Sequence, residues 1–135
     1  MNNEIKKIDK SNMAKMQKKS INSPDEKRTF EKGHIDLVTI GGVTFGRATF
    51  EPGWKWSESV KPIAKTDSCQ SQHLSYHISG RLKVTMADGS EEEFGPGDIS
   101  LIPPGHDAWV VGDEPVVAID ISGLEKYAKP STWTD

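Results

Sequence analysis

The sequence predicts an all-β domain built as an antiparallel sandwich or barrel. Short apolar runs recur between turns that contain Gly or Pro along most of the chain. Almost no stretch shows the 3.6-residue periodicity of a long helix. A chain of 135 residues is long enough to bury one core. Because the short strands alternate with turns and not with helices, we expect antiparallel sheets that pack or close on each other.

Apolar and β-branched residues give the positions of the expected strands. These strands cover residues 35–40, 43–50, 54–56, 73–79, 81–86, 90–94, 99–102, a strand starting at 106, and 116–121. The alternation is clearest in 81–86, whose apolar residues would face the core. Asp88-Gly89 has the composition of a hairpin turn. Residues 57–72 are polar and predict a long irregular loop, which is uncommon unless the loop is functional or covers something.

The stretch 97–109 places a histidine at one end of the expected barrel. Residues 99–102 form a short apolar run that favours a buried strand. Pro103 and Pro104 cannot donate hydrogen bonds to a neighbouring strand, so pairing has to stop there. The chain then turns, and His106 begins the next strand. We therefore expect His106 at the mouth of the barrel.

Charge and domain boundaries divide the chain into three parts. We expect a basic, flexible or partly helical arm over residues 1–28, a barrel over 29–123 and a tail over 124–135. The arm has six lysines in its first 23 residues, whereas the whole chain has a formal net charge of −3, so the barrel is acidic. An acidic barrel argues against a nucleic-acid partner.

Other features of the composition bear on localisation and cofactors. No apolar run has the length of a membrane span, and none follows the N-terminal lysines as in a signal peptide. Cys69 is the single cysteine, so there is no disulfide framework. We expect a cytoplasmic protein without a membrane partner. The sequence has no phosphate-binding loop or dinucleotide fingerprint, so we expect no nucleotide cofactor.

The turn pattern resembles that of the cupin family over about residues 35–122. The second cupin motif is G-x5-P-x-G-x2-H-x3-N. Gly97, Pro103 and Gly105 match its spacing, whereas Ala108 stands at the position of the histidine. The resemblance implies that the predicted barrel is a jelly roll.

The first cupin motif, G-x5-H-x-H-x3-4-E-x6-G, is less well matched. Counted back from Gly80, His73 stands at the position of the glutamate. With the shorter spacer, Asp67 and Cys69 stand at the two histidine positions; with the longer spacer, two hydroxyl residues stand there. The ligand pattern of the family is therefore not reproduced position by position.

The resemblance also implies a metal site. Cupin barrels usually hold a metal with three imidazoles and one carboxylate, a set that suits Fe, Mn, Ni or Zn. His73, His106, Cys69 and Asp67 lie in the same part of the sequence pattern. On a strand, His106 faces the same side as Ala108, one pleat away, and is a candidate to replace the missing histidine. These four residues are the candidate ligands for Zn or Fe; alternatively, the histidines are neutral pocket residues and Cys69 is a small buried hydrophobe.

Four further residues are candidates for contacting a ligand. Trp54 and Trp56 either line a pocket as flat apolar walls or pack in a homodimer interface, since small cupins commonly pair. Lys61 and Arg47 are candidates for binding an anionic ligand. If Arg47 faces inward it needs a partner; if it faces outward it is a solvated charge.

Three functional hypotheses follow. The first is a metal-dependent enzyme acting on a small polar or anionic molecule, which requires an open coordination position. The second is a non-catalytic module that binds or senses a small molecule without a metal. It is suggested by phrases such as 54–57 and 104–109, which resemble a subgroup of small bacterial and archaeal cupins, some of them fused to regulatory or cyclase domains. The third is a metal-independent enzyme with His73 as general base, oriented by Asp67.

Overall fold

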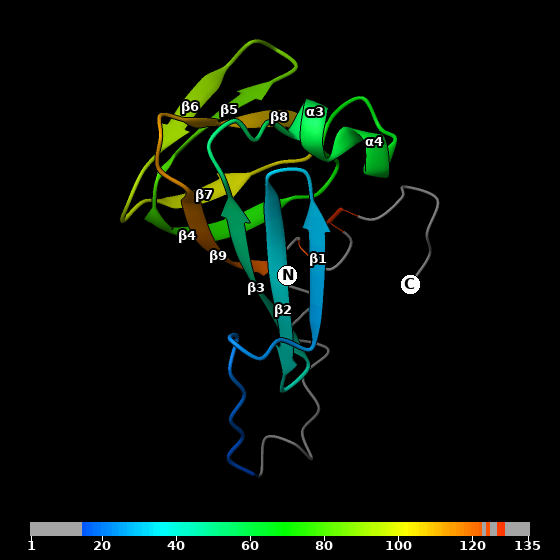
Figure 1. Cartoon of the computed structure of the whole chain (residues 1–135), viewed down its shortest axis with the longest axis vertical. Helices are drawn as coiled ribbons and strands as arrows, with labels where there is room; N and C mark the ends of the chain where they lie inside the picture. The colour runs from blue at the N-terminus through cyan, green and yellow to red at the C-terminus, as the bar shows by residue number, and fades with distance from the viewer. Residues whose placement is uncertain (1–14, 123, 125–126, 129–135) are drawn as a thin grey trace.

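The computed structural model of the chain describes residues 15–122, 124 and 127–128. Over these residues the chain forms two β-sheets with two short helices at one end (Figure 1). The elements in chain order are β1 (Glu26–Phe30), β2 (Gly33–Ile40), β3 (Val43–Phe50), α3 (Trp56–Ser59), α4 (Lys61–Ala64), β4 (His73–Ser79), β5 (Arg81–Met86), β6 (Glu91–Phe94), β7 (Ile99–Ile102), β8 (His106–Val111) and β9 (Val116–Ser122).

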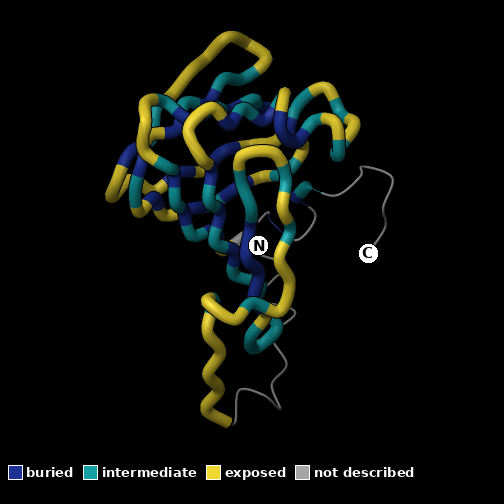
Figure 2. Tube along the Cα trace, viewed as in Figure 1, coloured by how far each residue is buried: buried dark blue, intermediate teal, exposed yellow. Residues whose placement is uncertain are grey.

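The strands are paired in an antiparallel jelly-roll arrangement. The larger sheet has the order β1-β2-β3-β9-β4-β7 and the smaller sheet has the order β6-β5-β8. Strand β9, the last in the sequence, lies between β3 and β4 and pairs antiparallel with both. Buried residues lie on both sheets, and the exposed segments are mainly turns and the chain before β1 (Figure 2). This arrangement confirms the predicted all-β, antiparallel jelly-roll barrel.

Alternation along the strands determines which side chains enter the barrel. In β5, Leu82 and Val84 are buried, and in β8, His106, Ala108 and Val110 are buried. Successive side chains of a strand point to opposite faces of the sheet, so these five residues share the inner face of the smaller sheet. The polar His106 therefore lies on the same face as the apolar core residues.

The first strand was not predicted. Strand β1 begins at Glu26, inside the range assigned to the arm, and pairs with β2 at the end of the larger sheet. Its sequence is mostly charged or polar, so it has no apolar run to predict a strand. Charged side chains are typical of an edge strand because they discourage pairing with another chain.

The predicted strand over residues 54–56 is wrong, and so is the prediction that 57–72 is entirely irregular. Trp56 begins α3, and α4 follows with Pro62 in its first turn, a position where proline fits a helix. Both Trp54 and Trp56 are nevertheless buried. Trp54 stacks on Phe50 with ring centroids 3.9 Å apart.

The described part of the predicted arm begins with an exposed stretch, residues 15–20 (Figure 2). Lys19 joins it to the sheet through a hydrogen bond to the carbonyl oxygen of Thr39 and an ion pair with Asp25. The rest of the arm, residues 1–14, and most of the predicted tail lie outside the described residues. Among the described helices, none combines the length and the apolar character needed to cross a membrane.

We predict that Gly80→Ala destabilises the fold more than Gly89→Ala does. Both glycines have positive φ angles, +75° and +89°, so alanine at either position should cost about 1–2 kcal/mol of unfolding free energy. A Cβ at Gly80 would also collide with the backbone of Pro115, whereas a Cβ at Gly89 would meet nothing. The collision should add about 1–3 kcal/mol. Urea unfolding measures the difference, and equal losses in the two variants would contradict the prediction.

Candidate metal centre and cavity

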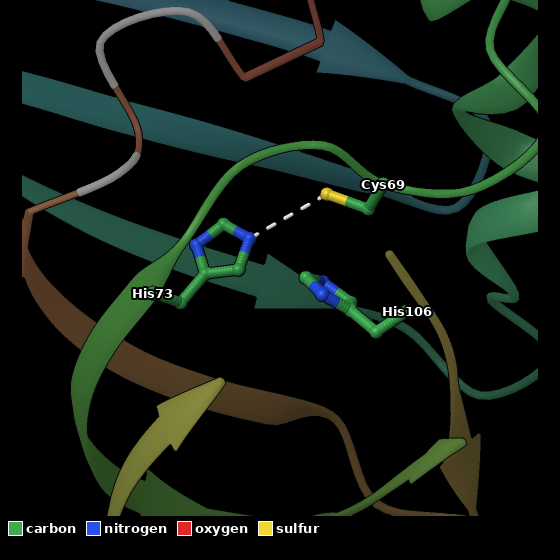
Figure 3. A group of neighbouring side chains, drawn as sticks. All are labelled: Cys69, His73 and His106. Atoms are coloured by element: carbon green, nitrogen blue, oxygen red, sulfur yellow. Dashed lines mark hydrogen bonds between the residues drawn. The ribbon is translucent and has the colours of Figure 1, made fainter. Parts of the chain in front are cut away.

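Three potential metal ligands converge at one end of the barrel (Figure 3). Cys69 belongs to the loop before β4, His73 is the first residue of β4, and His106 is the first residue of β8. All three are buried, and one donor atom of each lies within 4.8 Å of the others. Cys69 Sγ is 3.6 Å from His73 Nε2. The structure thus brings together three of the four candidate metal ligands.

Two of these residues are joined by their backbones. Cys69 and His106 form an isolated antiparallel β-bridge. The amide of Cys69 donates to the carbonyl oxygen of His106 at 2.8 Å, and the amide of Gly105 donates to the carbonyl oxygen of Cys69 at 2.7 Å. The positions of the thiol and the imidazole are therefore linked independently of their side-chain contacts.

In each imidazole, Nδ1 has a hydrogen-bond acceptor. His73 Nδ1–H donates to Asp120 Oδ2 at 3.1 Å, and the Ser75 hydroxyl donates to the same oxygen at 3.0 Å. His106 Nδ1–H donates to the carbonyl oxygen of Pro103 at 2.7 Å. Once Nδ1 carries the proton of a neutral imidazole, Nε2 has a free lone pair. Each ring can therefore bind a metal through Nε2 once that nitrogen carries no proton.

The pKa values of Cys69 and His73 shift in opposite directions. Burial raises the pKa of the Cys69 thiol, but hydrogen bonds from His106 and His73 and their positive charge together have a larger, lowering effect, and the pKa falls from 9.0 to about 6. Burial lowers the pKa of His73, but the hydrogen bonds to Asp120 and Cys69 and their negative charges together have a larger, raising effect, and the pKa rises from 6.5 to about 9. Between these two values the protein without a metal holds a thiolate beside a protonated imidazole.

A cavity of about 50 Å³ adjoins the cluster. It is lined by Ala48, Phe50, Trp54, Trp56, His73, Ser75, His77, Leu82, Ser100, Ile102, His106, Ala108, Ala118, Asp120, Leu124 and Tyr127. Both tryptophans predicted to form pocket walls are among these residues, and Cys69 is not. The cavity walls are mainly apolar, and the two histidines of the cluster form part of its polar surface.

The other predicted site residues lie outside the cavity. The Asp67 side chain is fully exposed, and its carboxylate is 3.9 Å from Lys61 Nζ. Arg47 forms an ion pair with buried Asp36 at 3.0 Å and donates to Asn22 Oδ1 at 2.9 Å. The structure therefore does not place Asp67 with the metal ligands. Lys61 and Arg47 have carboxylate partners of their own and do not reach a ligand in the cavity.

Sequence reasoning missed Asp120. Val116 and Ala118 of β9 are buried, so residue 120 shares their inward face. An acid at an inward position of an apolar strand requires a partner, and this signal could have identified it. The carboxylate that orients His73 is Asp120, not Asp67 as the general-base hypothesis assumed.

No protein-family model and no curated protein matches the sequence. Several solved structures match the fold. The polyketide cyclase RemF from Streptomyces resistomycificus is 15% identical, with a TM-score of 0.56, and the match covers 82% of this chain and 81% of RemF. A Klebsiella pneumoniae protein with a double-stranded β-helix domain is 18% identical, with a TM-score of 0.55 and coverage of 84% and 89%. A cupin-like protein from Thermotoga maritima is 18% identical, with a TM-score of 0.52 and coverage of 79% and 83%.

These structural matches, together with the strand order, define the fold class. The chain has the cupin fold, a small double-stranded β-helix. At these levels of identity the matches show the fold alone. Function has to be argued from the cluster and the cavity.

We predict that Cys69 is a thiolate at neutral pH in the metal-free protein. Because hydrogen bonds and charge from the two histidines outweigh burial, the thiolate absorbance at 240 nm should rise with a midpoint near pH 6. His106→Gln should raise this midpoint because it removes the larger of the two lowering hydrogen bonds. Cys69→Ser should abolish the step. A wild-type midpoint near the ordinary thiol value of 9.0 would contradict the prediction.

Proposed function

We propose that this barrel binds one transition metal ion, zinc or iron, and a small polar molecule beside it. The ligands are Cys69 Sγ, His73 Nε2 and His106 Nε2. The observation that carries the proposal is the convergence of donor atoms from these three buried residues, two of which, His73 and His106, line a cavity. One thiolate and two imidazoles form a donor set that suits zinc or iron.

The distances fit a shared ion. Donor atoms around a tetrahedral zinc ion lie roughly 3.3–3.8 Å apart, given metal–ligand bonds of about 2.0–2.3 Å. Cys69 Sγ and His73 Nε2 are already 3.6 Å apart, and the remaining separations are within 4.8 Å. Side-chain adjustments on the order of 1 Å complete such a set.

The outer hydrogen bonds also fit a metal site. Imidazoles that bind metals usually donate the other ring N–H to a carboxylate or a backbone carbonyl, which fixes the ring and raises its basicity. Asp120 has this role for His73, and the carbonyl of Pro103 has it for His106. These two Nδ1–H hydrogen bonds, one in each ring, support the assignment of both histidines as metal ligands.

Three protein ligands leave a position for a bound molecule. Structural zinc sites usually have four protein ligands, whereas sites with three keep a place for water or substrate. Because His73 and His106 line the cavity, that place faces the cavity. A bound ion would act there as a Lewis acid that polarises an oxygen of the molecule. One protein of similar fold is an enzyme, a polyketide cyclase, so catalysis at this position is the more specific form of the proposal.

The same contacts favour a second candidate function, nucleophilic catalysis by Cys69 without a metal. Cys69, His73 and Asp120 form a hydrogen-bonded chain of nucleophile, base and orienting carboxylate. However, a nucleophile has to reach its substrate, and Cys69 is buried and does not line the cavity. This hydrogen-bonded arrangement of Cys69, His73 and Asp120 also gives no role to His106. The metal site accounts for all three residues and is the function that we prefer.

We predict that the protein purified without an affinity tag contains one equivalent of zinc or iron, or takes it up when the ion is added. Mass spectrometry of the metal content measures this. Cys69→Ser and His106→Gln should lose the ion because each removes a ligand. Asp120→Asn should keep the ligands but weaken the affinity roughly 10- to 100-fold, since it disturbs only the outer contact of His73.

His34→Gln is the matched control. His34 lies on β2, pairs with Asp36 and is not part of the cluster, so this variant should bind the metal as the wild type does. A wild-type protein that binds neither ion would contradict the metal proposal. Labelling of Cys69 that is prevented by bound small molecules would then favour the nucleophile, and ligand binding without labelling would favour a non-catalytic binding module.

A reducing compartment suits the proposed site. Cys69 is a free, buried cysteine, and a thiolate ligand has to stay reduced to hold the ion. We therefore place the protein in the cytoplasm.

We also propose that the chain forms a homodimer through the outer face of β4 and β7. Tyr76 and Ile78 of β4 and Ile99 and Leu101 of β7 are all exposed there, and Tyr76 is paired with Ile99 in the sheet. These outward residues are uncharged, so two copies that each carry a net negative charge can approach through this face without repulsion.

We predict that Leu101→Glu converts the dimer to a monomer, because it places two like charges in the interface. Light scattering coupled to size-exclusion chromatography measures the mass. Lys27→Glu, which adds negative charge on β1 at the opposite end of the sheet, should leave the dimer intact. A wild-type monomer at micromolar concentration would contradict the proposal.

A further inference from the structure

Two polar nitrogen atoms in the cavity walls have no partner. Trp54 Nε1 and His77 Nδ1 are buried and make no hydrogen bond within the described part of the chain. Both side chains are only 2% exposed, and both residues line the cavity beside the metal cluster. Buried polar groups almost always have a partner in native proteins, so each such atom requires an explanation.

Neither ring is free to turn toward another partner. Trp54 stacks on Phe50 with an interplanar angle of 19°. His77 stacks on Phe94 with an interplanar angle of 9°, and its Nε2 is 2.8 Å from the Ser100 hydroxyl oxygen. Packing therefore fixes both rings against the wall. The partner of the two nitrogens has to come from the cavity.

The chemistry of the wall limits what the partner can be. An indole N–H only donates, so the atom facing Trp54 has to be an acceptor. Among the described residues, no lysine or arginine lines the cavity, and the one carboxylate there, Asp120, is already bonded to His73 and Ser75. Burial is the main cause that lowers the pKa of His77, which is therefore a neutral ring at neutral pH. Apart from the proposed metal site, the described residues that line the cavity therefore offer no positive charge to an anionic molecule.

The remaining walls are mainly apolar. Phe50, Leu82, Ile102 and the alanine side chains of β3, β8 and β9 supply most of the surface. A polyol such as a sugar would leave several hydroxyl groups without partners against these walls. The cavity of about 50 Å³ has room for a few water molecules or a small ring.

We propose that Trp54 Nε1–H binds an uncharged small molecule that has an apolar body and a carbonyl oxygen. The indole N–H donates to the carbonyl oxygen. The proposal deepens the proposed function and rests on it in one respect, that the cavity is where the small molecule binds. The sequence led us to expect an anionic ligand bound by Lys61 and Arg47. Because neither residue lines the cavity, we propose a neutral ligand instead.

The test uses two probes of the same shape, cyclopentanone and methylenecyclopentane, of which only the ketone has an acceptor. The indole N–H signals of the ¹⁵N-labelled, zinc-loaded protein are followed by NMR, and the Trp54 signal is identified by its loss in Trp54→Phe. We expect cyclopentanone to move the Trp54 signal downfield as a hydrogen bond forms. Methylenecyclopentane should not produce this downfield shift.

Variants measure the energy of the same contact. Trp54→Phe removes the donor and should weaken cyclopentanone binding about three- to tenfold, the effect of one neutral hydrogen bond, without weakening methylenecyclopentane binding. Trp109→Phe is the control, because Trp109 lies on the opposite face of β8 from His106 and does not line the cavity. If Trp54→Phe fails to fold, Trp56→Phe, Trp109→Phe and Trp133→Phe assign the other three indole signals, and the shift of the remaining signal in the wild-type protein decides the question.

The outcomes separate this proposal from the metal site. Equal responses to the two probes, or no shift of the Trp54 signal in protein shown to contain zinc, would overturn the anchoring role and leave the metal site standing. A ketone-specific shift in protein that binds no metal would support the anchoring role and overturn the metal site.

Discussion

The hydrogen bond between His73 and Asp120 is the contact on which the arrangement of the site depends. Asp120 is a buried carboxylate, which is unfavourable inside a barrel unless it accepts hydrogen bonds. Its strand pairs with β4 in a register that puts Asp120 opposite Ser75, and both Ser75 and His73 donate to it. The pairing of β9 with β4 thus sets the orientation of the His73 ring. That orientation points Nε2 at Cys69, so the geometry of the cluster follows from the register of the sheet.

The fold was predictable because its signals are local. Alternating apolar residues mark the strands, and glycines such as Gly80 mark turns that need a positive φ angle. The clustering of three of the four candidate ligands was also predictable, from motif spacing and from the equivalence of positions one pleat apart on β8. Asp67 was misplaced because spacing gives a position in the sequence but not the direction of a loop. Helix α4 ends at Lys65 in a left-handed conformation, φ +60°, and the chain that follows carries Asp67 into solvent.

The rest of the site depends on pairing between distant segments. His73 and Asp120 are 47 residues apart, and no local sequence pattern predicts which strands are neighbours in the larger sheet. The partner of Arg47 is an instructive contrast. Counting back from the Gly41-Gly42 turn pairs Arg47 with Asp36 directly across the hairpin. That ion pair was within reach of the sequence, and it removes Arg47 from the candidates for ligand binding.

The backbone bridge between Cys69 and His106 has a consequence for how the proposed site would take up an ion. The loop that carries the thiolate is hydrogen-bonded to the strand that carries the imidazole by the fold itself, before any metal arrives. Little conformational entropy then remains to be lost on coordination, so the centre is preorganised. Small zinc domains behave differently, because their ligands are ordered only by the metal and the chain unfolds without it. For the proposed site this means that a chelator would remove the ion and leave the barrel standing, so that loading and unloading would be reversible in a protein that stays folded.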